Sequence, residues 1–149
     1  DVQTTPVQTR LNVDNAADLL AGHDLILDGT DSFATRFLIN DAALAVKTPL
    51  ISGAVGRFNA QVSVFAQPGP CYRCLVPELP PQEETCAEVG VVGALTGIAG
   101  SVMAMEAIKW ITGAGNPLSG RLWMYDGLTA DSRTISLSRD PACPACSDL

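Results

Sequence analysis

The clearest signal of the fold is at residues 24–55, which read DLILDGTDSFATRFLINDAALAVKTPLISGAV. It opens with a short apolar run at 24–28, and such a run is typical of a strand buried on both faces of a parallel sheet. Hydrophobic residues then recur at helical spacing from 33 to 45, and a second apolar run follows at 49–55. The order strand, helix, strand predicts a βαβ unit of a doubly wound sheet.

Local signals mark where this unit begins and where its helix ends. Residues 11–22 predict a short preceding helix, begun by Asp14 or Asn15 and closed by Gly22. Residues 47–49, which finish with a proline, should end the helix inside the unit.

The pattern changes after residue 56. Residues 60–66 alternate in polarity and predict a half-solvated antiparallel strand. The proline-rich segment 67–85 predicts a long crossover loop without a helix, and residues 121–138 predict a closing hairpin. The expected fold class is therefore α/β: a Rossmann-like doubly wound sheet that also contains mixed or antiparallel strands.

An apolar helix rich in glycine should precede the hairpin and end near Thr112. Small residues at 93, 97, 100 and 104 form a stripe that would let a neighbouring backbone approach closely. Residues 89–105 carry no charge and reach the short limit for a membrane span, but Glu106 and Lys109 follow at once. We expect a buried helix and no membrane association.

Length and charge limit the possible functions. The 149 residues suffice for one domain, and 47% of them are hydrophobic, which excludes a disordered chain. The formal net charge of −7 argues against a nucleic-acid-binding protein, which needs a basic surface. The chain begins at Asp1 and shows no secretory signal, so we expect a single-domain fragment of a cytoplasmic protein, residues 1–149.

Four of the five cysteines form two C-x-x-C pairs, Cys71 with Cys74 and Cys143 with Cys146. Four thiolates brought together by the fold make a closed tetrahedral zinc site, which would tie the end of the chain to the crossover loop. A rubredoxin-like iron site and disulfides are the alternatives. The zinc site would have a structural role.

The sequence DGTDS at 28–32 lies where the first strand ends and the helix begins, and ligands of doubly wound sheets bind at such strand ends. Asp31 is either an ordinary helix N-cap or a carboxylate that holds Mg²⁺ beside a nucleotide triphosphate. Ser32, Arg36 and Asn40 follow at intervals of four and share one helix face.

Seven short motifs occur in an order that resembles the MoeB/ThiF/HesA family of the ubiquitin-activating enzyme superfamily. They lie at 28–40 (D-x-T-D-S-x-x-x-R-x-x-x-N), 52–54 (S-G-A), 71–74 (C-Y-R-C), 85–90 (T-C-x-E-x-G), 103–109 (M-A-M-E-A-I-K), 124–126 (M-Y-D) and 143–146 (C-x-x-C).

This resemblance implies an adenylyltransferase that uses ATP and Mg²⁺. It would activate the C-terminal glycine of a ubiquitin-like sulfur-carrier protein of the MoaD/ThiS type, for molybdopterin, thiamine or related biosynthesis. Asp31 would then be the magnesium–ATP aspartate, Ser32 would lie beside the nucleotide, and Arg36 and Asn40 would support the site. The two cysteine pairs match the structural zinc ligands of the family. The strands of the missing N-terminal half would leave a sheet edge uncovered, so we expect a homodimer or another subunit to cover it.

Cys86 stands apart from the cysteine pairs, in the sequence ETCAEVG. It is either a small buried hydrophobe or, by the resemblance, a catalytic thiol that links covalently to the carrier. The family's glycine-rich nucleotide loop, G-x-G-x-x-G, belongs to an N-terminal half that is absent here, so the fragment alone should be inactive. The alternative function is a non-catalytic, zinc-stapled interaction module that binds a partner protein.

Overall fold

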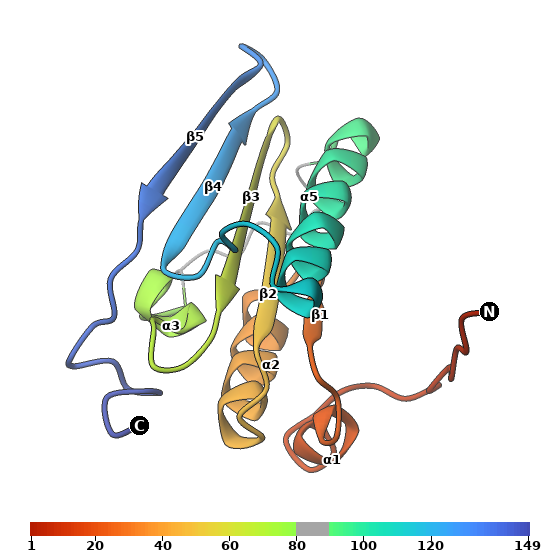
Figure 1. The fold of residues 1–149 in the computed structure, drawn as a ribbon, viewed down its shortest axis with the longest axis vertical. Coiled ribbons are helices and arrows are strands. Elements are labelled where there is room, and N and C mark those ends of the chain that lie inside the picture. Colours follow the sequence, from red (N-terminus) through yellow and green to blue (C-terminus); the bar gives the residue numbers. More distant parts are fainter. Residues whose placement is uncertain (80–89) are drawn as a thin grey trace.

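A computed structural model describes residues 1–79 and 90–149. Its centre is a five-stranded sheet in the order β1-β2-β3-β4-β5 (Figure 1). Helices α2 (Phe33–Ala45) and α5 (Gly93–Thr112) pack on opposite faces of this sheet. The predicted α/β class with mixed strand directions is confirmed.

The βαβ unit predicted from residues 24–55 is present. Strand β1 (Ile26–Asp28) pairs in parallel with β2 (Leu50–Val55), and α2 connects them. Helix α1 (Ala16–Leu20) precedes the unit and contacts α2. The prediction that β1 is buried on both faces is wrong, because the side chain of Leu27 is 50% exposed. Strand β1 lies at one edge of the described sheet, and only the α2 side covers it.

Strand β3 (Asn59–Phe65) runs antiparallel to β2, as predicted, but it is not half-solvated. Val62 and Val64 pack beneath α5, while Phe65 faces the α2 side and is also buried. The strand is central in the sheet, so both of its faces are covered. The polar residues Gln61 and Ser63 produced the alternation in the sequence. Ser63 is nevertheless buried, and its hydroxyl donates a hydrogen bond to the carbonyl of Arg121 at 2.8 Å.

The described part of the crossover segment, residues 67–79, contains a helical turn, although its prolines predict a loop without a helix. Helix α3 (Tyr72–Leu75) begins directly after Pro70 and Cys71 and is four residues long. Proline disrupts a helix only from within, and here Pro70 and Pro77 flank the turn. This short turn carries the first cysteine pair.

Helix α5 is present as predicted, but it is not a buried helix. Leu95, Ala99 and Met103 pack on the sheet, whereas the small-residue stripe at 93, 97, 100 and 104 is exposed. By length and composition α5 could cross a membrane. The structure buries 17% of its most apolar window, which is less than a core helix usually shows. The buried Glu106 and its neighbour Lys109 form an ion pair at the sheet-facing side, and Glu106 Oε2 accepts the amide of Leu118 at 2.7 Å.

The predicted hairpin closes the sheet. Strands β4 (Arg121–Asp126) and β5 (Asp131–Ser136) are antiparallel, and β4 pairs with β3. After β5 the chain turns back so that its C-terminal segment lies beside α3 (Figure 1). The fold thereby brings the two cysteine pairs together.

Candidate nucleotide site and metal centre

A cavity of about 290 Å³ lies at the carboxyl ends of β1 and β2. The loop 29–31 and the first turns of α2 form one wall, and the middle of α5 forms another. Asp31, Arg36 and Tyr72 contribute the functional side chains of its lining. This is the position at which doubly wound sheets bind their ligands.

The sequence left two roles open for Asp31, a helix N-cap and a carboxylate that holds a cation, and the structure gives the first of these to Ser32. Ser32 is the N-cap of α2, and its Oγ accepts the amide of Thr35 at 3.1 Å. Asp31 is exposed at the cavity and makes no hydrogen bond within the part of the chain that the structure describes. Its carboxylate is therefore available to a cation.

Arg36 is buried and braces the loop that carries Asp31. Its Nη1 donates to the carbonyl of Gly53 at 2.9 Å and to Ser52 Oγ at 3.3 Å, and its Nη2 donates to the carbonyl of Thr30. These bonds tie the loop to the end of β2. Arg36 also lines the cavity.

Asp28 completes this buried network. Its side chain is 2% exposed, and Oδ1 accepts both the amide of Thr30 at 2.9 Å and the Thr30 hydroxyl at 2.7 Å. Oδ2 lies 4.0 Å from Nη1 of Arg36. No role was predicted for Asp28, although it is the first letter of the D-x-T-D motif and the last residue of β1.

Asn40 lies away from the cavity, two helical turns beyond Ser32. Its Oδ1 accepts the amide of Tyr72 at 2.8 Å, and its Nδ2 donates to Asp41 at 3.0 Å. Asp41 in turn binds both Nε and Nη2 of Arg73, at 2.9 and 2.7 Å. The end of α2 therefore anchors α3, and any support that Asn40 gives to the cavity passes through that turn.

Tyr72 lines the cavity but was not predicted as a site residue, and only its place in C-Y-R-C marks it in the sequence. Its ring packs edge-to-face against Phe37 and Phe65, with centroids 5.9 and 5.8 Å apart. Burial raises the pKa of its hydroxyl, and the positive charge of Arg36 opposes part of that rise. The phenol therefore stays neutral at physiological pH.

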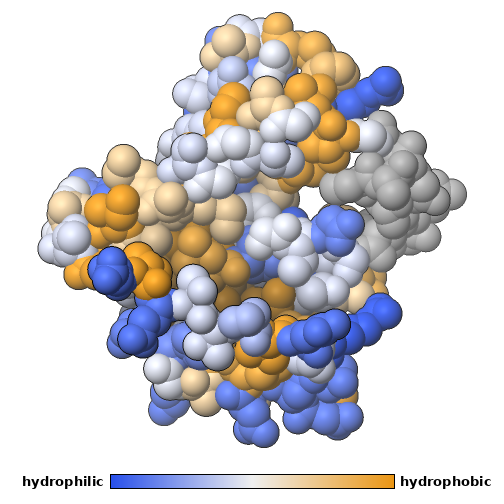
Figure 2. All heavy atoms as spheres, turned by 90° about the vertical axis from the view of Figure 1, so that its right-hand side faces the viewer, coloured by the Kyte–Doolittle hydropathy of each residue, from blue (hydrophilic) through white to orange (hydrophobic). Residues whose placement is uncertain are grey.

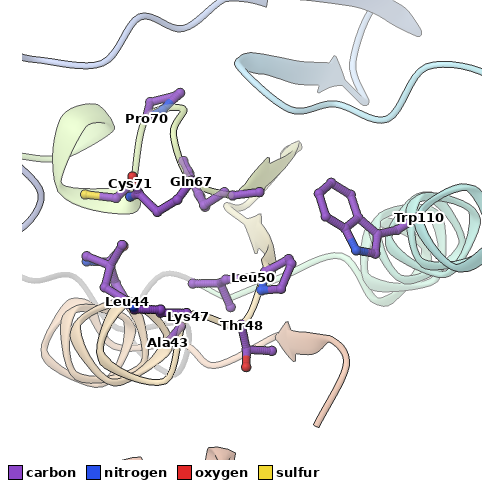
Figure 3. Close-up of a pocket in the computed structure, with 13 residues that line it drawn as sticks. Ala43, Leu44, Lys47, Thr48, Leu50, Gln67, Pro70, Cys71 and Trp110 are labelled. Carbon is purple, nitrogen blue, oxygen red and sulfur yellow. The ribbon is translucent and has the colours of Figure 1, made fainter. Parts of the chain in front are cut away.

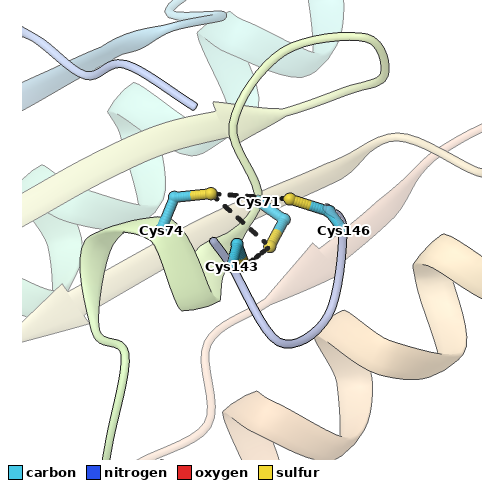
Figure 4. Close-up of side chains that lie close together, drawn as sticks. All are labelled: Cys71, Cys74, Cys143 and Cys146. Atoms are coloured by element: carbon cyan, nitrogen blue, oxygen red, sulfur yellow. Dashed lines mark hydrogen bonds between the residues drawn. The ribbon is translucent and has the colours of Figure 1, made fainter. Parts of the chain in front are cut away.

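The four predicted cysteine ligands meet in one cluster (Figure 4). The Sγ atoms of Cys71 and Cys143 are 3.6 Å apart, those of Cys74 and Cys146 are 3.5 Å apart, and all four lie within 4.8 Å of one another. Metal–sulfur bonds of about 2.3 Å in a tetrahedron place sulfurs about 3.8 Å apart, whereas a disulfide needs about 2.05 Å. The cluster fits a four-coordinate metal and excludes disulfides among these four residues.

The thiols show why this cluster suits a cation. Burial raises the pKa of Cys71 far above its usual range and that of Cys146 to about 11. Burial also acts to raise the pKa of Cys143, but hydrogen bonds from the amides of Ala145 and Cys146 outweigh it and lower that pKa. A metal ion would stabilise the thiolate forms of Cys71 and Cys146, which burial otherwise disfavours.

A second cavity, of about 110 Å³, lies at the other end of β2 (Figure 3). It is lined by Leu50, Gln67 and Trp110, with Lys47 and Cys71 as its titratable residues. The residues that line it are all different from those that line the cavity at Asp31. Its largely apolar lining does not offer the carboxylate and cation pair that a magnesium nucleotide needs.

Cys86 lies outside the described residues, so its predicted catalytic role stays a prediction.

Together, the strand-end cavity with the exposed carboxylate of Asp31 and the four-cysteine cluster define a Rossmann-like domain with a group of thiols that could hold a metal ion. Comparison with known proteins identifies the family. The profile of the ThiF family matches residues 1–145, and the chain belongs to that family.

Two curated relatives illustrate the similarity. A sulfur carrier protein adenylyltransferase from Thermus thermophilus is 46% identical over 99% of this chain and 56% of its own length. A molybdopterin-synthase adenylyltransferase from Escherichia coli is 45% identical over 97% of this chain and 59% of its own length. The chain thus spans somewhat more than half the length of these relatives.

The solved structures agree on the fold. The crystal structure of E. coli MccB with ATP aligns with a TM-score of 0.78 over 95% of this chain and 45% of MccB. The sequence identity is 15%, so this likeness concerns the fold alone.

Proposed function

We propose that the chain is part of an ATP-dependent adenylyltransferase that activates the C-terminal glycine of a ubiquitin-like sulfur-carrier protein. One observation carries the proposal: Asp31 lines a strand-end cavity in a chain 46% identical to a sulfur carrier protein adenylyltransferase. The same relatives make a purely structural interaction module the weaker alternative. Molybdopterin, thiamine or related biosynthesis is the proposed setting, in the cytoplasm.

The reaction places a carboxylate beside a triphosphate, so negative charge must be neutralised. The carrier carboxylate attacks the α-phosphate of ATP, an acyl adenylate forms, and pyrophosphate leaves. Bound Mg²⁺ supplies the charge that draws the phosphates to this acidic loop. Asp31 would hold the cation, Ser32 would lie beside the nucleotide, and Arg36 would keep the loop in place while facing the cavity. The tail glycine is already ionised near neutral pH and needs no general base.

The four-cysteine cluster is proposed to hold zinc. Zinc prefers four thiolates in a closed tetrahedral arrangement, and the buried position of Cys143 and Cys146 leaves no open coordination site for chemistry. Metal analysis of the purified protein distinguishes zinc from iron.

A homodimer is also proposed. The outward face of α5 carries exposed apolar side chains, including Met105, Ile108 and Ile111. Figure 2 shows hydrophobic surface interspersed with pale, weakly polar surface on the side of the molecule where α5 lies. A protein surface of this kind is typical of an interface.

ATP–pyrophosphate exchange in the presence of a carrier tests the proposed activity. In the full-length protein, Asp31→Asn should lower exchange by roughly 100-fold or more, because the cation loses its ligand, while thermal stability stays unchanged. Asp24→Asn, on the exposed turn before β1, is the matched control and should retain full exchange. Residues 1–149 contain no G-x-G-x-x-G loop, so the isolated chain should show background exchange. Exchange by Asp31→Asn at the wild-type rate contradicts the role of this residue.

A further inference from the structure

Arg139 lies between β5 and the second cysteine pair, and its side chain contacts the segment that carries this pair. Its Nη2 donates to the carbonyl of Cys146, to that of Ser147 at 3.4 Å and to that of Leu149 at 2.7 Å. These carbonyls belong to the turn that presents Cys143 and Cys146 to the cluster (Figure 4). The guanidinium therefore holds the end of this turn from one side.

The next residue, Asp140, contacts the first cysteine pair. Its backbone amide donates to Sγ of Cys74 at 3.5 Å, and its Oδ1 accepts the amide of Ala142 at 2.8 Å. An amide that donates to a cysteine sulfur stabilises the thiolate form, which is the form that binds a metal. Residues 139 and 140 thus contact both halves of the cluster, the first through its side chain and the second through its backbone.

We propose that Arg139 is a positioning residue for the metal centre: by fixing the turn that carries Cys143 and Cys146, it raises the affinity of the four cysteines for their metal ion. The inference rests on the metal centre proposed above and is independent of the adenylyltransferase activity. Arg139 itself is not a ligand, since a guanidinium has only donors and stays charged in proteins.

The first physical reason is the cost of ordering the C-terminal segment. No helix or strand contains residues 137–149, so the order of the second cysteine pair depends on turns and on side-chain contacts. The bonds from Arg139 to three carbonyls supply part of this order before the ion binds. Binding of the ion then has less ordering to accomplish, and its affinity rises.

The second physical reason is charge. Four thiolates around a divalent ion carry a net negative charge, and a buried anionic centre is stabilised by a cation nearby. Arg73, the arginine between the first two cysteines, is already bound to Asp41 by two hydrogen bonds. No Asp or Glu side chain in residues 1–79 and 90–149 forms an ion pair with Arg139, so no other side chain offsets its charge.

Zinc binding by the full-length protein tests the proposal without ATP or a carrier. The protein is stripped of metal, reloaded with Zn²⁺ and titrated against a chelator that changes colour when it binds Zn²⁺. Arg139→Gln removes the charge and is too short to reach all three carbonyls, so we expect Zn²⁺ affinity to fall roughly 10-fold to 100-fold. Release of Zn²⁺ from the loaded protein into excess chelator should accelerate by a similar factor, and this measurement stays valid where the stripped variant does not refold.

Two further variants separate the geometry of Arg139 from its charge and from the net charge of the protein. Arg139→Lys keeps the charge but replaces the planar guanidinium by a single ammonium, so we expect an intermediate loss of Zn²⁺ affinity. Arg133→Gln removes an arginine from the exposed strand β5 and should leave Zn²⁺ affinity as in the wild type. Equal losses in Arg133→Gln and Arg139→Gln would contradict a local role for Arg139.

Thermal unfolding with and without chelator separates a role at the metal from general stabilisation. Arg139→Gln should lower the melting temperature of the zinc-loaded protein by at least about 3 °C, and that of the stripped protein by clearly less. An equal fall in both proteins, or Zn²⁺ affinity within about twofold of wild type, overturns the proposal. A wild-type protein that binds no Zn²⁺ overturns the metal centre itself.

Discussion

Asp28 is the residue on which the loop before α2 depends. It takes two hydrogen bonds from Thr30 and provides the carboxylate nearest to the buried guanidinium of Arg36. A buried charge that loses its counterpart is costly, because water cannot replace the partner. The neighbouring Asp31 has the opposite character: it is exposed and contributes little to stability.

Replacing Asp28 by asparagine should therefore lower the free energy of unfolding by about 3 kcal/mol, measured by urea denaturation. Asp31→Asn should change it by less than about 0.5 kcal/mol, as is usual for exposed sites. Equal effects of the two substitutions would show that the Asp28–Arg36 pair does not stabilise the fold.

For single residues, the positions of the motif could be predicted from the sequence, but which of them line the cavity could not. The sequence placed Asp31, Ser32, Arg36 and Asn40 on one stretch of helix. The structure places Asp31 and Arg36 at the cavity and directs Asn40 to the cysteine turn. The partners of Arg36 and Asn40 come from β2 and α3, and helical spacing carries no information about them.

At the scale of elements, the contact between α5 and β2 shows where glycine is required. A Cβ on Gly53 of β2 would overlap Sδ of Met103, so any side chain at this position requires Met103 to move. By contrast, a Cβ on Gly97 of α5 would meet no atom within 4 Å. The close approach that the sequence predicted for the glycine stripe occurs instead at a glycine in a strand.

Two alanine substitutions should thus have opposite effects on stability. Gly53→Ala should destabilise the chain by about 1–3 kcal/mol, since Met103 must move within a packed core. Gly97→Ala should stabilise it by about 0.5–1 kcal/mol, because alanine is the better helix former. Thermal unfolding of the two variants gives both values, and destabilisation by Gly97→Ala would indicate that the stripe is covered.

At the scale of the whole molecule, the four-cysteine cluster closes the longest connection in the fold. It joins residues 72 positions apart, on α3 and on the C-terminal segment. Arg139 helps by donating to the carbonyls of Cys146 and Leu149, the latter at 2.7 Å. A cross-link over such a span restricts the unfolded chain strongly.

Removal of the metal should lower stability by about 4 kcal/mol, the chain-entropy value for a cross-link of this span. For a domain of this size the melting temperature should fall by roughly 10 °C. Differential scanning calorimetry with and without chelator measures the change. Cys143→Ser should reproduce it, whereas Ser147→Ala on the same segment should not, and an unchanged melting temperature would contradict a stabilising metal.

The proposed dimer is tested by a charge on the outward face of α5. Ile108→Glu should weaken self-association by roughly tenfold or more in sedimentation equilibrium, because a carboxylate would be buried at the interface. Leu128→Glu, on the exposed turn between β4 and β5, is the control and should leave association unchanged. A wild-type protein that stays monomeric contradicts the dimer, and a dimer insensitive to Ile108→Glu contradicts this surface.

Local patterns in the sequence were sufficient to predict the βαβ unit, the closing hairpin, the meeting of the four cysteines and the family. Each of these depends on local periodicity, on turn residues or on short motifs, all of which can be recognised without knowing what packs where. Local patterns could not predict four features that the tertiary structure shows: the exposed face of α5, the burial of β3, the helical turn α3 and the position of Tyr72. They depend on which surfaces meet in space, and residues such as Asn40 and Tyr72 meet only after the sheet has brought distant segments together.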